Sequence, residues 1–270
     1  MFLVVNRQNE QKMPHEFNGE EYKKASTHQK EWGNKIIAEF KLKGDERILD
    51  LGCGDGALTV ELAQLVPNGF VLGIDGSHGM IETARKLETK NLSFKVQDIN
   101  NLDYENEFDV MFSNATLHWI KDHNRLLKNV YRSLKPNGIL RFNFGAEGNC
   151  VNFIRIIQVA MQLPEYADYF IGFDSPWYFP ELDKYEKLVK EFPFREMRVW
   201  GENADRYFPD VTAIVKWIDQ PSMVPFLEVI PPAQKEVFRD YVVEKMIAAT
   251  LQKDGTCFET FRRINVWARR

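Results

Sequence analysis

Three glycines alternate in the stretch ILDLGCGDG at residues 48–56, directly after a run of apolar residues. Glycine at this density marks a backbone that turns sharply or approaches a ligand closely. Pyrophosphate-binding turns have the spacing GxGxxG, whereas here Gly56 comes one residue too early for that motif. Asp50 also precedes the first glycine, and its carboxylate would repel a pyrophosphate. The turn therefore favours a ligand that carries positive charge near this position.

Polar side chains also end the next apolar segments of the chain. Asp75 closes FVLGID, Asp98 closes LSFKVQD and Asn114 closes FDVMFSN. Short apolar runs of this kind are typical of strands in a parallel sheet that is covered on both faces, and such sheets bind ligands beyond the carboxyl ends of their strands. Together with Asp50, these side chains predict one site for a ligand with an ammonium and a sulfonium. S-adenosylmethionine is such a ligand.

Helices alternate with these strands between residues 46 and 145. The pattern predicts strands at 47–51, 70–75, 92–98, 108–114 and 138–145. It predicts helices at 57–65, 77–87 and 122–134. This alternation, with right-handed crossovers, predicts a doubly wound α/β fold. Later strands at 196–202 and 262–270 would extend the sheet, and further helices are expected at 20–40, 150–162, 181–191, 211–218 and 233–250.

The segments LDLGCGDG, GIDGSHGMI and the strand at 108–114 resemble those of class I S-adenosylmethionine-dependent methyltransferases, over roughly residues 45–145. The resemblance implies a mostly parallel, seven-stranded, Rossmann-like sheet. It also implies that Asp75 binds the ribose hydroxyls, that Asp98 and Ile99 contact the adenine above Met80, and that Asn114 borders the methionine. The complete set of cofactor-binding residues expected on this basis is Asp50, Gly52, Gly54, Asp75, Gly76, Ser77, Met80, Asp98, Ile99 and Asn114.

A narrower resemblance reaches the second half of the chain. The segment SNATLHWIKDH at 113–123 and the stretch RVWGENADRYFPDVTAIVKWIDQPSMVPFL at 198–227 resemble trans-aconitate methyltransferases. The segment TLHWIKD and the terminal VWARR also resemble juvenile hormone acid methyltransferases. Both families methylate a carboxylate oxygen. The resemblance therefore implies a small-molecule carboxyl O-methyltransferase whose acceptor is a trans-aconitate-like or an apolar organic acid, with S-adenosyl-L-homocysteine as the product.

Methylation of a carboxylate needs orientation more than acid–base chemistry, because a carboxylate is already ionised near pH 7. The protein must hold the oxygen about 3 Å from the methyl carbon and exclude water. Gln29, His118 and Trp119 are the candidate catalytic residues, since each can donate a hydrogen bond to the second carboxylate oxygen. Each could instead have a structural role: Gln29 as an exposed helical residue, His118 as a polar residue at a helix start, and Trp119 in core packing.

Two other functions remain open from the sequence. The same fold could methylate a phenol oxygen, an amine or a carbon, and His118 would then be the base. Alternatively, the chain could bind S-adenosylmethionine without catalysis. A nicotinamide dehydrogenase is disfavoured by the glycine spacing.

The chain is expected to divide into four segments. Residues 1–44 would form an N-terminal helical segment that covers the cofactor, and 45–145 the S-adenosylmethionine-binding core. Residues 146–195 would form a helical and aromatic cap inserted after the fifth strand, and 196–270 would complete the sheet with flanking helices. The aromatic residues expected to cap the site are Phe170, Phe173, Trp177, Tyr178 and Phe179.

Composition sets the broader expectations. The 270 residues carry a formal charge of −4, so no strongly basic field favours nucleic acid. The three cysteines are isolated and no His, Asp or Glu cluster has ligand spacing, so neither a metal site nor a disulfide framework is predicted. No apolar stretch has the roughly 18 residues that span a bilayer. A cytoplasmic protein with a small-molecule acceptor is expected, and the oligomeric state stays open, a monomer included.

Overall fold

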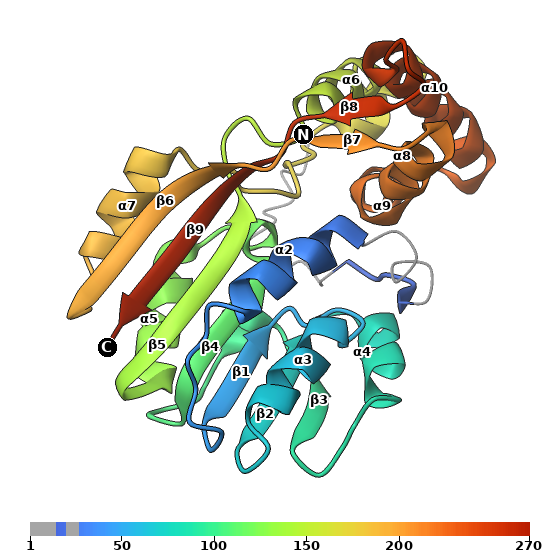
Figure 1. The fold of residues 1–270 in the computed structure, drawn as a ribbon. Coiled ribbons are helices and arrows are strands. Elements are labelled where there is room, and N and C mark those ends of the chain that lie inside the picture. The colour runs from blue at the N-terminus through green and yellow to red at the C-terminus, as the bar shows by residue number, and fades with distance from the viewer. Residues whose placement is uncertain (1–14, 20–26) are drawn as a thin grey trace, which may run out of the picture.

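A computed structural model describes residues 15–19 and 27–270. Its main feature is a seven-stranded sheet with the strand order β3-β2-β1-β4-β5-β9-β6 (Figure 1), in which only β9 runs antiparallel to its neighbours. This confirms the predicted doubly wound, mostly parallel sheet. The strands are β1 (Arg47–Leu51), β2 (Phe70–Asp75), β3 (Leu92–Val96), β4 (Phe108–Asn114), β5 (Leu134–Gly145), β6 (Glu196–Asn203) and β9 (Arg262–Arg269).

Helices cover both faces of this sheet (Figure 1). The face with α2 (Thr27–Ile37), α3 (Ala57–Leu65) and α4 (His78–Arg85) has one apolar core, and the face with α5 (His123–Ser133) and α7 (Leu182–Lys190) has another. Side chains alternate between the two faces of a strand. Accordingly, Ile48 of β1 packs in the first core while Leu49 and Leu51 pack in the second.

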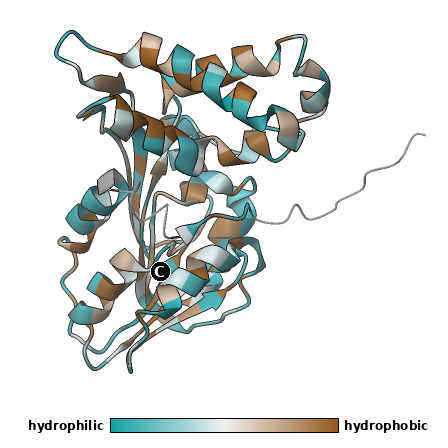
Figure 2. Cartoon of the chain, turned by 90° about the vertical axis from the view of Figure 1, so that its right-hand side faces the viewer, coloured by the Kyte–Doolittle hydropathy of each residue, from teal (hydrophilic) through white to brown (hydrophobic). Residues whose placement is uncertain are grey.

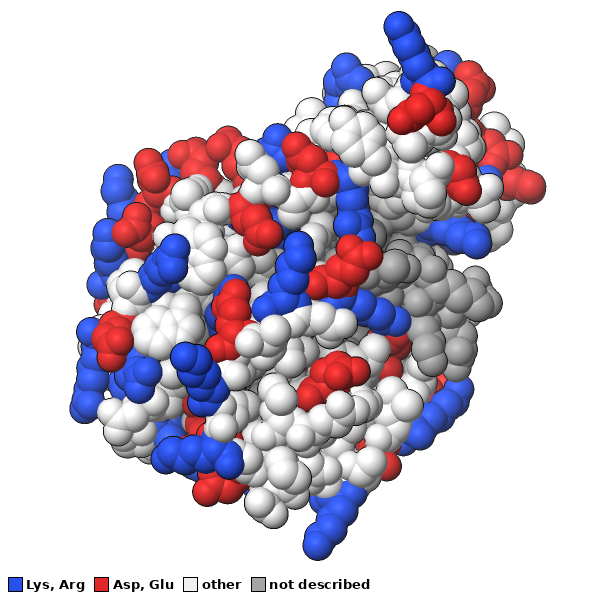
Figure 3. Space-filling model, in the orientation of Figure 1, with Lys and Arg blue, Asp and Glu red and all other residues white. Residues whose placement is uncertain are grey.

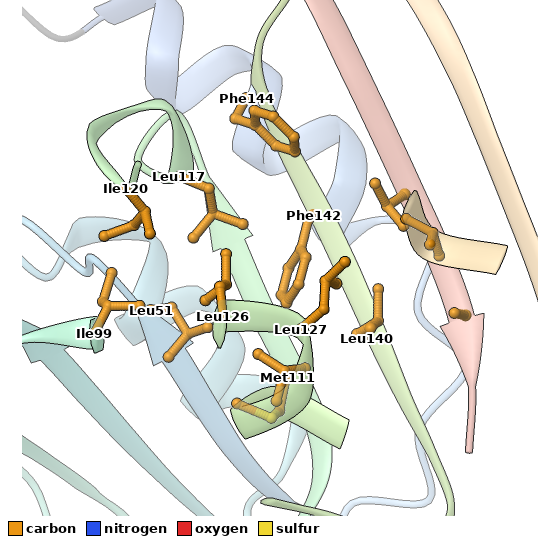
Figure 4. Packing of buried hydrophobic residues seen from close by; sticks show 14 of the residues in the cluster. Leu51, Ile99, Met111, Leu117, Ile120, Leu126, Leu127, Leu140, Phe142 and Phe144 are labelled. Atoms are coloured by element: carbon orange, nitrogen blue, oxygen red, sulfur yellow. The ribbon is translucent and has the colours of Figure 1, made fainter. Parts of the chain in front are cut away.

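The core under α5 anchors the turn that borders the site. Leu126 and Leu127 of α5 lie against Met111, Leu140 and Phe142 of the central strands (Figure 4). The 3₁₀ turn η2 (Leu117–Trp119) inserts its first residue into the same core, where Leu117 is fully buried. Burial of this leucine fixes the direction in which the next two residues of the turn project.

A cap with its own apolar core lies beyond the carboxyl ends of the parallel strands (Figure 1). It draws on two stretches of the chain rather than on 146–195 alone, because α10 packs against α6. The cap elements are α6 (Val151–Met161), η3 (Ala167–Phe170), β7 (Arg206–Phe208), α8 (Val211–Trp217), η4 (Ile218–Ser222), α9 (Val224–Leu227), α10 (Pro232–Thr250) and β8 (Cys257–Glu259). Figure 2 shows the cap and the sheet one above the other, with hydrophobic segments on the helices of both.

Acidic and basic side chains are interspersed over the face shown in Figure 3. Within residues 15–19 and 27–270, no helix combines the length and the apolar character that crossing a bilayer would require. In the same ranges, no three His, Cys, Asp or Glu side chains form a group that could hold a metal ion.

Candidate active site

A cavity of about 490 Å³ opens between the carboxyl edge of the sheet and the cap. The predicted site residues that line it are Gln29, Gly52, Gly54, Asp75, Gly76, Ser77, Met80, Asp98, Ile99, His118 and Trp119. The two remaining predicted residues, Asp50 and Asn114, line a recess of about 40 Å³. Gln29, Gly52 and Gly54 border both spaces. The structure therefore brings all the predicted site residues together.

The glycine turn forms the floor of the cavity. The backbone N–H groups of Gly52 and Cys53 both donate to the Ile74 carbonyl, at 2.8 and 2.9 Å, which fixes the turn to β2. Gly52 has φ +74°, in the left-handed region that favours glycine. A Cβ on Gly52 would collide with Thr116, whose Oγ1 and Cβ would lie 2.5 and 2.6 Å away. Both the backbone conformation and the space therefore require glycine here.

Replacing Gly52 by alanine is expected to destabilise the turn by more than backbone strain alone, and to reduce cofactor binding. Gly172 is the matched control, because it has φ +73° with no atom within 4 Å of its would-be Cβ. Strain in the left-handed region costs about 1–2 kcal/mol, so Gly172→Ala should lose about that much in denaturant unfolding. Gly52→Ala should lose more, and should also weaken binding of S-adenosylmethionine in calorimetry. Equal losses in the two variants would mean that Thr116 moves aside without cost.

Asp75 is held in a fixed orientation at the end of β2. Its Oδ2 accepts from the Gly54 N–H at 3.0 Å and its Oδ1 from the Ser77 N–H at 2.9 Å. Burial raises the pKa of this carboxyl above its usual value, and the two backbone hydrogen bonds oppose that rise. Both oxygens keep acceptor capacity, since a carboxylate offers about four lone-pair sites. The result is a preoriented acceptor that faces the cavity.

Ser77 and Glu16 join the N-terminal segment to this part of the site. Ser77 caps α4, with Oγ accepting from the Met80 N–H at 3.3 Å. The same hydroxyl donates to Glu16 at 2.8 Å, and Glu16 also accepts from the backbone N–H groups of His78 and Gly79, at 3.1 and 2.6 Å. A carboxylate is favourable at a helix N-terminus. Glu16 was not predicted as a site residue, because it lies in no predicted strand or helix.

Asp98, Ile99 and Met80 form another part of the cavity wall. Asp98 begins the turn η1 (Ile99–Asn101), where its Oδ1 accepts from the backbone and side-chain N–H groups of Asn100 at 2.8 and 2.9 Å. Ile99 and Met80 are both buried and apolar. Two apolar side chains beside a carboxylate suit a flat, amphipathic group such as a nucleobase.

The recess beside the glycine turn is rich in hydrogen-bond acceptors. Asn114 donates from Nδ2 to the Gln29 backbone carbonyl at 2.8 Å. In the part of the chain that the structure describes, Asn114 Oδ1 and Gln29 Oε1 are buried and have no hydrogen-bond partner. Leaving such an acceptor unpaired costs about 1–3 kcal/mol. A ligand with several N–H donors, such as the ammonium of a bound amino acid, would satisfy both oxygens.

Asp50 places a carboxyl group, which can ionise, in the same recess. It is 2% exposed and accepts from Thr59 Oγ1 at 2.8 Å. Burial, followed by repulsion from Asp75, raises the pKa of the Asp50 carboxyl to about 7. A cationic ligand would favour its ionised form. The glycine turn, the fixed carboxylate and the unpaired acceptors together fit S-adenosylmethionine.

His118 and Trp119 of η2 face the cap side of the cavity. Burial lowers the pKa of His118 well below its usual value, and the positive charge of Arg263 lowers it further. The ring is therefore neutral near pH 7. Its Nδ1 accepts a long hydrogen bond of 3.5 Å from the Gly145 N–H, so the ring proton is assigned to Nε2 and makes that atom a donor. The Trp119 ring packs against Trp177 at 5.6 Å between centroids.

Aromatic side chains from the cap and from the sheet part of the molecule enclose the side of the cavity next to His118 and Trp119. We call this side the acceptor chamber. Of the aromatic residues predicted to cap the site, only Trp177 and Phe179 line the cavity. The prediction was wrong for Phe170 and Phe173, which pack in the cap core, and Tyr178 lies against His123. Besides Trp119, the other phenylalanine and tryptophan residues that line the cavity are Phe17, Trp32, Phe153, Trp217 and Phe261. Distant parts of the chain supply them, so local composition could not identify them.

Comparison with known proteins agrees with this arrangement. A family model described as a methyltransferase domain matches residues 42–159. An uncharacterized methyltransferase of Schizosaccharomyces pombe is 29% identical over 260 residues, which cover 93% of this chain and 97% of that protein. A trans-aconitate 2-methyltransferase of Deinococcus radiodurans is 28% identical over 207 residues, which cover 75% of this chain and 79% of that protein.

A solved structure shares the fold over most of the chain. It is phosphoethanolamine N-methyltransferase 2 of Haemonchus contortus in complex with S-adenosyl-L-methionine. The two match with a TM-score of 0.58 and 21% identity, over 93% of this chain and 56% of that one. The matched domain and the methyltransferase relatives agree with the fit of S-adenosylmethionine to the part of the cavity around the glycine turn and Asp75. The chain therefore contains a methyltransferase domain over residues 42–159 and is an S-adenosylmethionine-dependent methyltransferase.

Proposed function

We propose that this enzyme methylates a carboxylate oxygen of a small organic acid. The observation that carries the proposal is the chemistry of the acceptor chamber, where hydrogen-bond donors and aromatic walls surround a histidine of lowered pKa. Hydrogen-bond donors suit a methyl acceptor that is already anionic. A weakly basic histidine suits a reaction in which no proton has to be removed from the substrate. The similarity to the Deinococcus radiodurans trans-aconitate 2-methyltransferase supports the same reaction class.

The cofactor end of the cavity has the groups that this role requires. When bound, S-adenosylmethionine supplies a methyl group on a sulfonium. We assign Asp75 to the ribose hydroxyls, and Asp98, Ile99 and Met80 to the adenine. Gly52 and Gly54 let the backbone pass close beneath the ligand. Gly76 and Ser77 continue the wall beside Asp75.

The methionine end of the cofactor is assigned to the acceptor-rich recess. Asn114 Oδ1 and Gln29 Oε1 would accept from the ammonium, with Asp50 supplying charge. The proposed role of Gln29 therefore shifts from the methyl acceptor toward the cofactor. This reassignment follows from the unpaired Oε1, because an acid acceptor needs a donor while an ammonium needs an acceptor.

The chain's contribution to the reaction is orientation and exclusion of water. His118 Nε2–H and the Trp119 indole N–H can each donate to the carboxylate oxygen that is not methylated. The aromatic rings around them keep the chamber dry, which strengthens such hydrogen bonds. Holding the reacting oxygen about 3 Å from the methyl carbon accounts for a large part of the rate enhancement.

The alternative is methylation of a phenol oxygen, an amine or a carbon with His118 as the base. The lowered pKa of His118 disfavours this alternative, because a base works best with a pKa near the operating pH. The long contact from the Gly145 N–H to Nδ1 disfavours it too, since it leaves the ring proton on the other nitrogen.

A labelled-methyl assay against a panel of acids, phenols and amines separates these functions. We expect label to enter carboxylic acids, and we expect mild alkali to release it, since the product would be a methyl ester. The control for each positive is the same compound as its preformed methyl ester, which should accept no label. Label that enters only phenols or amines, or that survives alkali, would contradict the proposal.

A further inference from the structure

A buried arginine, the second residue of β9, faces the acceptor chamber. Arg263 is 3% exposed and lines the cavity. Asn143 Oδ1 accepts from its Nε at 2.9 Å and from its Nη2 at 2.6 Å. The guanidinium also stacks over the Trp32 ring at 4.5 Å. The guanidinium is therefore held by neighbours on separate elements, which preorients it.

The charge of Arg263 acts on the chamber. Burial lowers the pKa of His118 and the Arg263 charge lowers it further, whereas burial raises the pKa of Cys150 and the same charge opposes that rise; both residues line the cavity. The Trp32 ring beneath the guanidinium packs against Phe261 at 5.3 Å between ring centroids, and both rings line the cavity. A cation in such low-dielectric surroundings attracts anions more strongly than one on the surface does. Arginine is also suited to carboxylates, because its fork of N–H groups matches their geometry.

The register of the sheet separates Arg263 from the methionine end of the site. Asn114 of β4 pairs with Asn143 of β5, which pairs with Asn265 of β9. Adjacent strands lie about 4.8 Å apart, so Asn114 and Asn265 are roughly 10 Å apart. Arg263 lies two residues before Asn265 in β9, where it pairs with Gly145 at the end of β5. An anion held by Arg263 is therefore displaced sideways from the proposed ammonium position, toward the cap.

We propose that Arg263 binds an anionic group of the methyl acceptor other than the one that is methylated. This inference rests on the proposed function and deepens it. The acceptor is then an acid with at least two anionic groups and an apolar or unsaturated body between them. Asn143 is the positioning residue for this interaction. Asn265 supports Asn143 in turn, because its Oδ1 accepts from Asn143 Nδ2 at 2.9 Å.

Arg141 offers a closely matched control. It lies on the neighbouring strand β5, is 2% exposed and donates to Asn265 Oδ1 at 3.0 Å. It also stacks over a tryptophan, Trp200, at 4.7 Å. It pairs with Glu39 at 2.9 Å, and it is not among the residues that line the cavity. A change to methionine therefore removes a similar buried arginine from each position, and only one of them faces the chamber.

The test measures binding to the full chain loaded with S-adenosylhomocysteine, by calorimetry. The probes are linear dicarboxylates of four to eight carbons and their monomethyl esters, which keep one carboxylate. In the wild type, the best dicarboxylate should bind about 100-fold tighter than its monoester, as expected for a desolvated charge pair. Arg263→Met should reduce that ratio to about one, and Arg263→Lys should retain part of it. Arg141→Met should leave it unchanged.

Several outcomes would overturn the proposal. One is a wild type that binds diacid and monoester equally, and another is a ratio that Arg263→Met leaves intact. A third is an equal fall of the ratio in the Arg263→Met and Arg141→Met variants, which would indicate a structural effect. If Arg263→Met does not fold, the lysine variant decides through the same ratio. Because binding is measured without methyl transfer, Arg263-dependent binding without ester formation would contradict the proposed reaction and leave the anion site standing.

Discussion

Replacing Asp75 by alanine is expected to weaken S-adenosylmethionine binding by at least about 100-fold while the protein stays folded. Two hydroxyls donating to one carboxylate are charge-assisted hydrogen bonds, each with a contribution of about 1.5–3 kcal/mol. The variant also leaves the Gly54 and Ser77 N–H groups without the acceptor that now orients them. The loss should appear as a higher Kd in calorimetry, with secondary structure unchanged by circular dichroism.

Asp109 provides the control for this substitution. It lies on β4, and its Oδ2 accepts from the Arg47 N–H at 2.8 Å, so it too is a carboxylate fixed by a backbone donor. It is not among the residues that line either cavity space. Asp109→Ala should leave the cofactor Kd within about twofold of the wild type. If Asp75→Ala bound the cofactor as tightly as Asp109→Ala, Asp75 would not be a cofactor-binding residue.

The raised pKa of Asp75 also gives the sign of a pH effect. The protonated carboxyl is a poorer acceptor for the ribose, so affinity should increase with pH as Asp75 ionises. Binding should release protons in that range. Calorimetry in buffers of different ionisation enthalpy would detect this release, and Asp75→Ala should lack the contribution from Asp75.

The cofactor end of the site could be predicted because local patterns determine it. Each parallel strand is a short apolar run, and the residue that follows it must lie at the carboxyl edge of the sheet. The proximity of Asp75 and Asp98 at this edge can therefore be predicted without knowledge of tertiary contacts. Ser77 was likewise recognisable as a helix cap from its place before α4.

The acceptor chamber could not be predicted by the same reasoning. Because β9 is antiparallel, its first residues lie at the edge where the parallel strands end. Arg263 is therefore not found by looking for polar residues that follow a strand. Arg262 and Arg263 are adjacent in the sequence, and it is the structure that shows Arg263 to be buried. Glu16 contacts α4 across about sixty residues, and no local pattern reports such a contact. The short strands β7 and β8 have three residues each, too few for an alternation pattern.

Asp50→Asn is expected to make the free enzyme more stable at pH 8 and to weaken its cofactor binding. The carboxyl has a pKa of about 7 in the fold, against an ordinary value of 3.8 for aspartate. A raised pKa means that the native state holds the proton longer, so stability falls as pH rises from about 4 to 7. Above pH 7 the buried carboxylate costs up to about 4 kcal/mol. An amide avoids this cost and can still accept from Thr59.

The measurement is the free energy of unfolding of Asp50→Asn relative to the wild type, by denaturant titration between pH 4 and pH 8. The difference should be small at pH 4, grow through the window and become constant near pH 8. Asp55→Asn is the control, since Asp55 lies in the same loop but pairs with Lys30 at 2.9 Å, and its loss should not stabilise. Calorimetry at pH 8 should show weaker cofactor binding for Asp50→Asn, because the ammonium loses a negative partner. A stability difference that does not change with pH would show that Asp50 is ionised throughout, and that its charge is already compensated in the free enzyme.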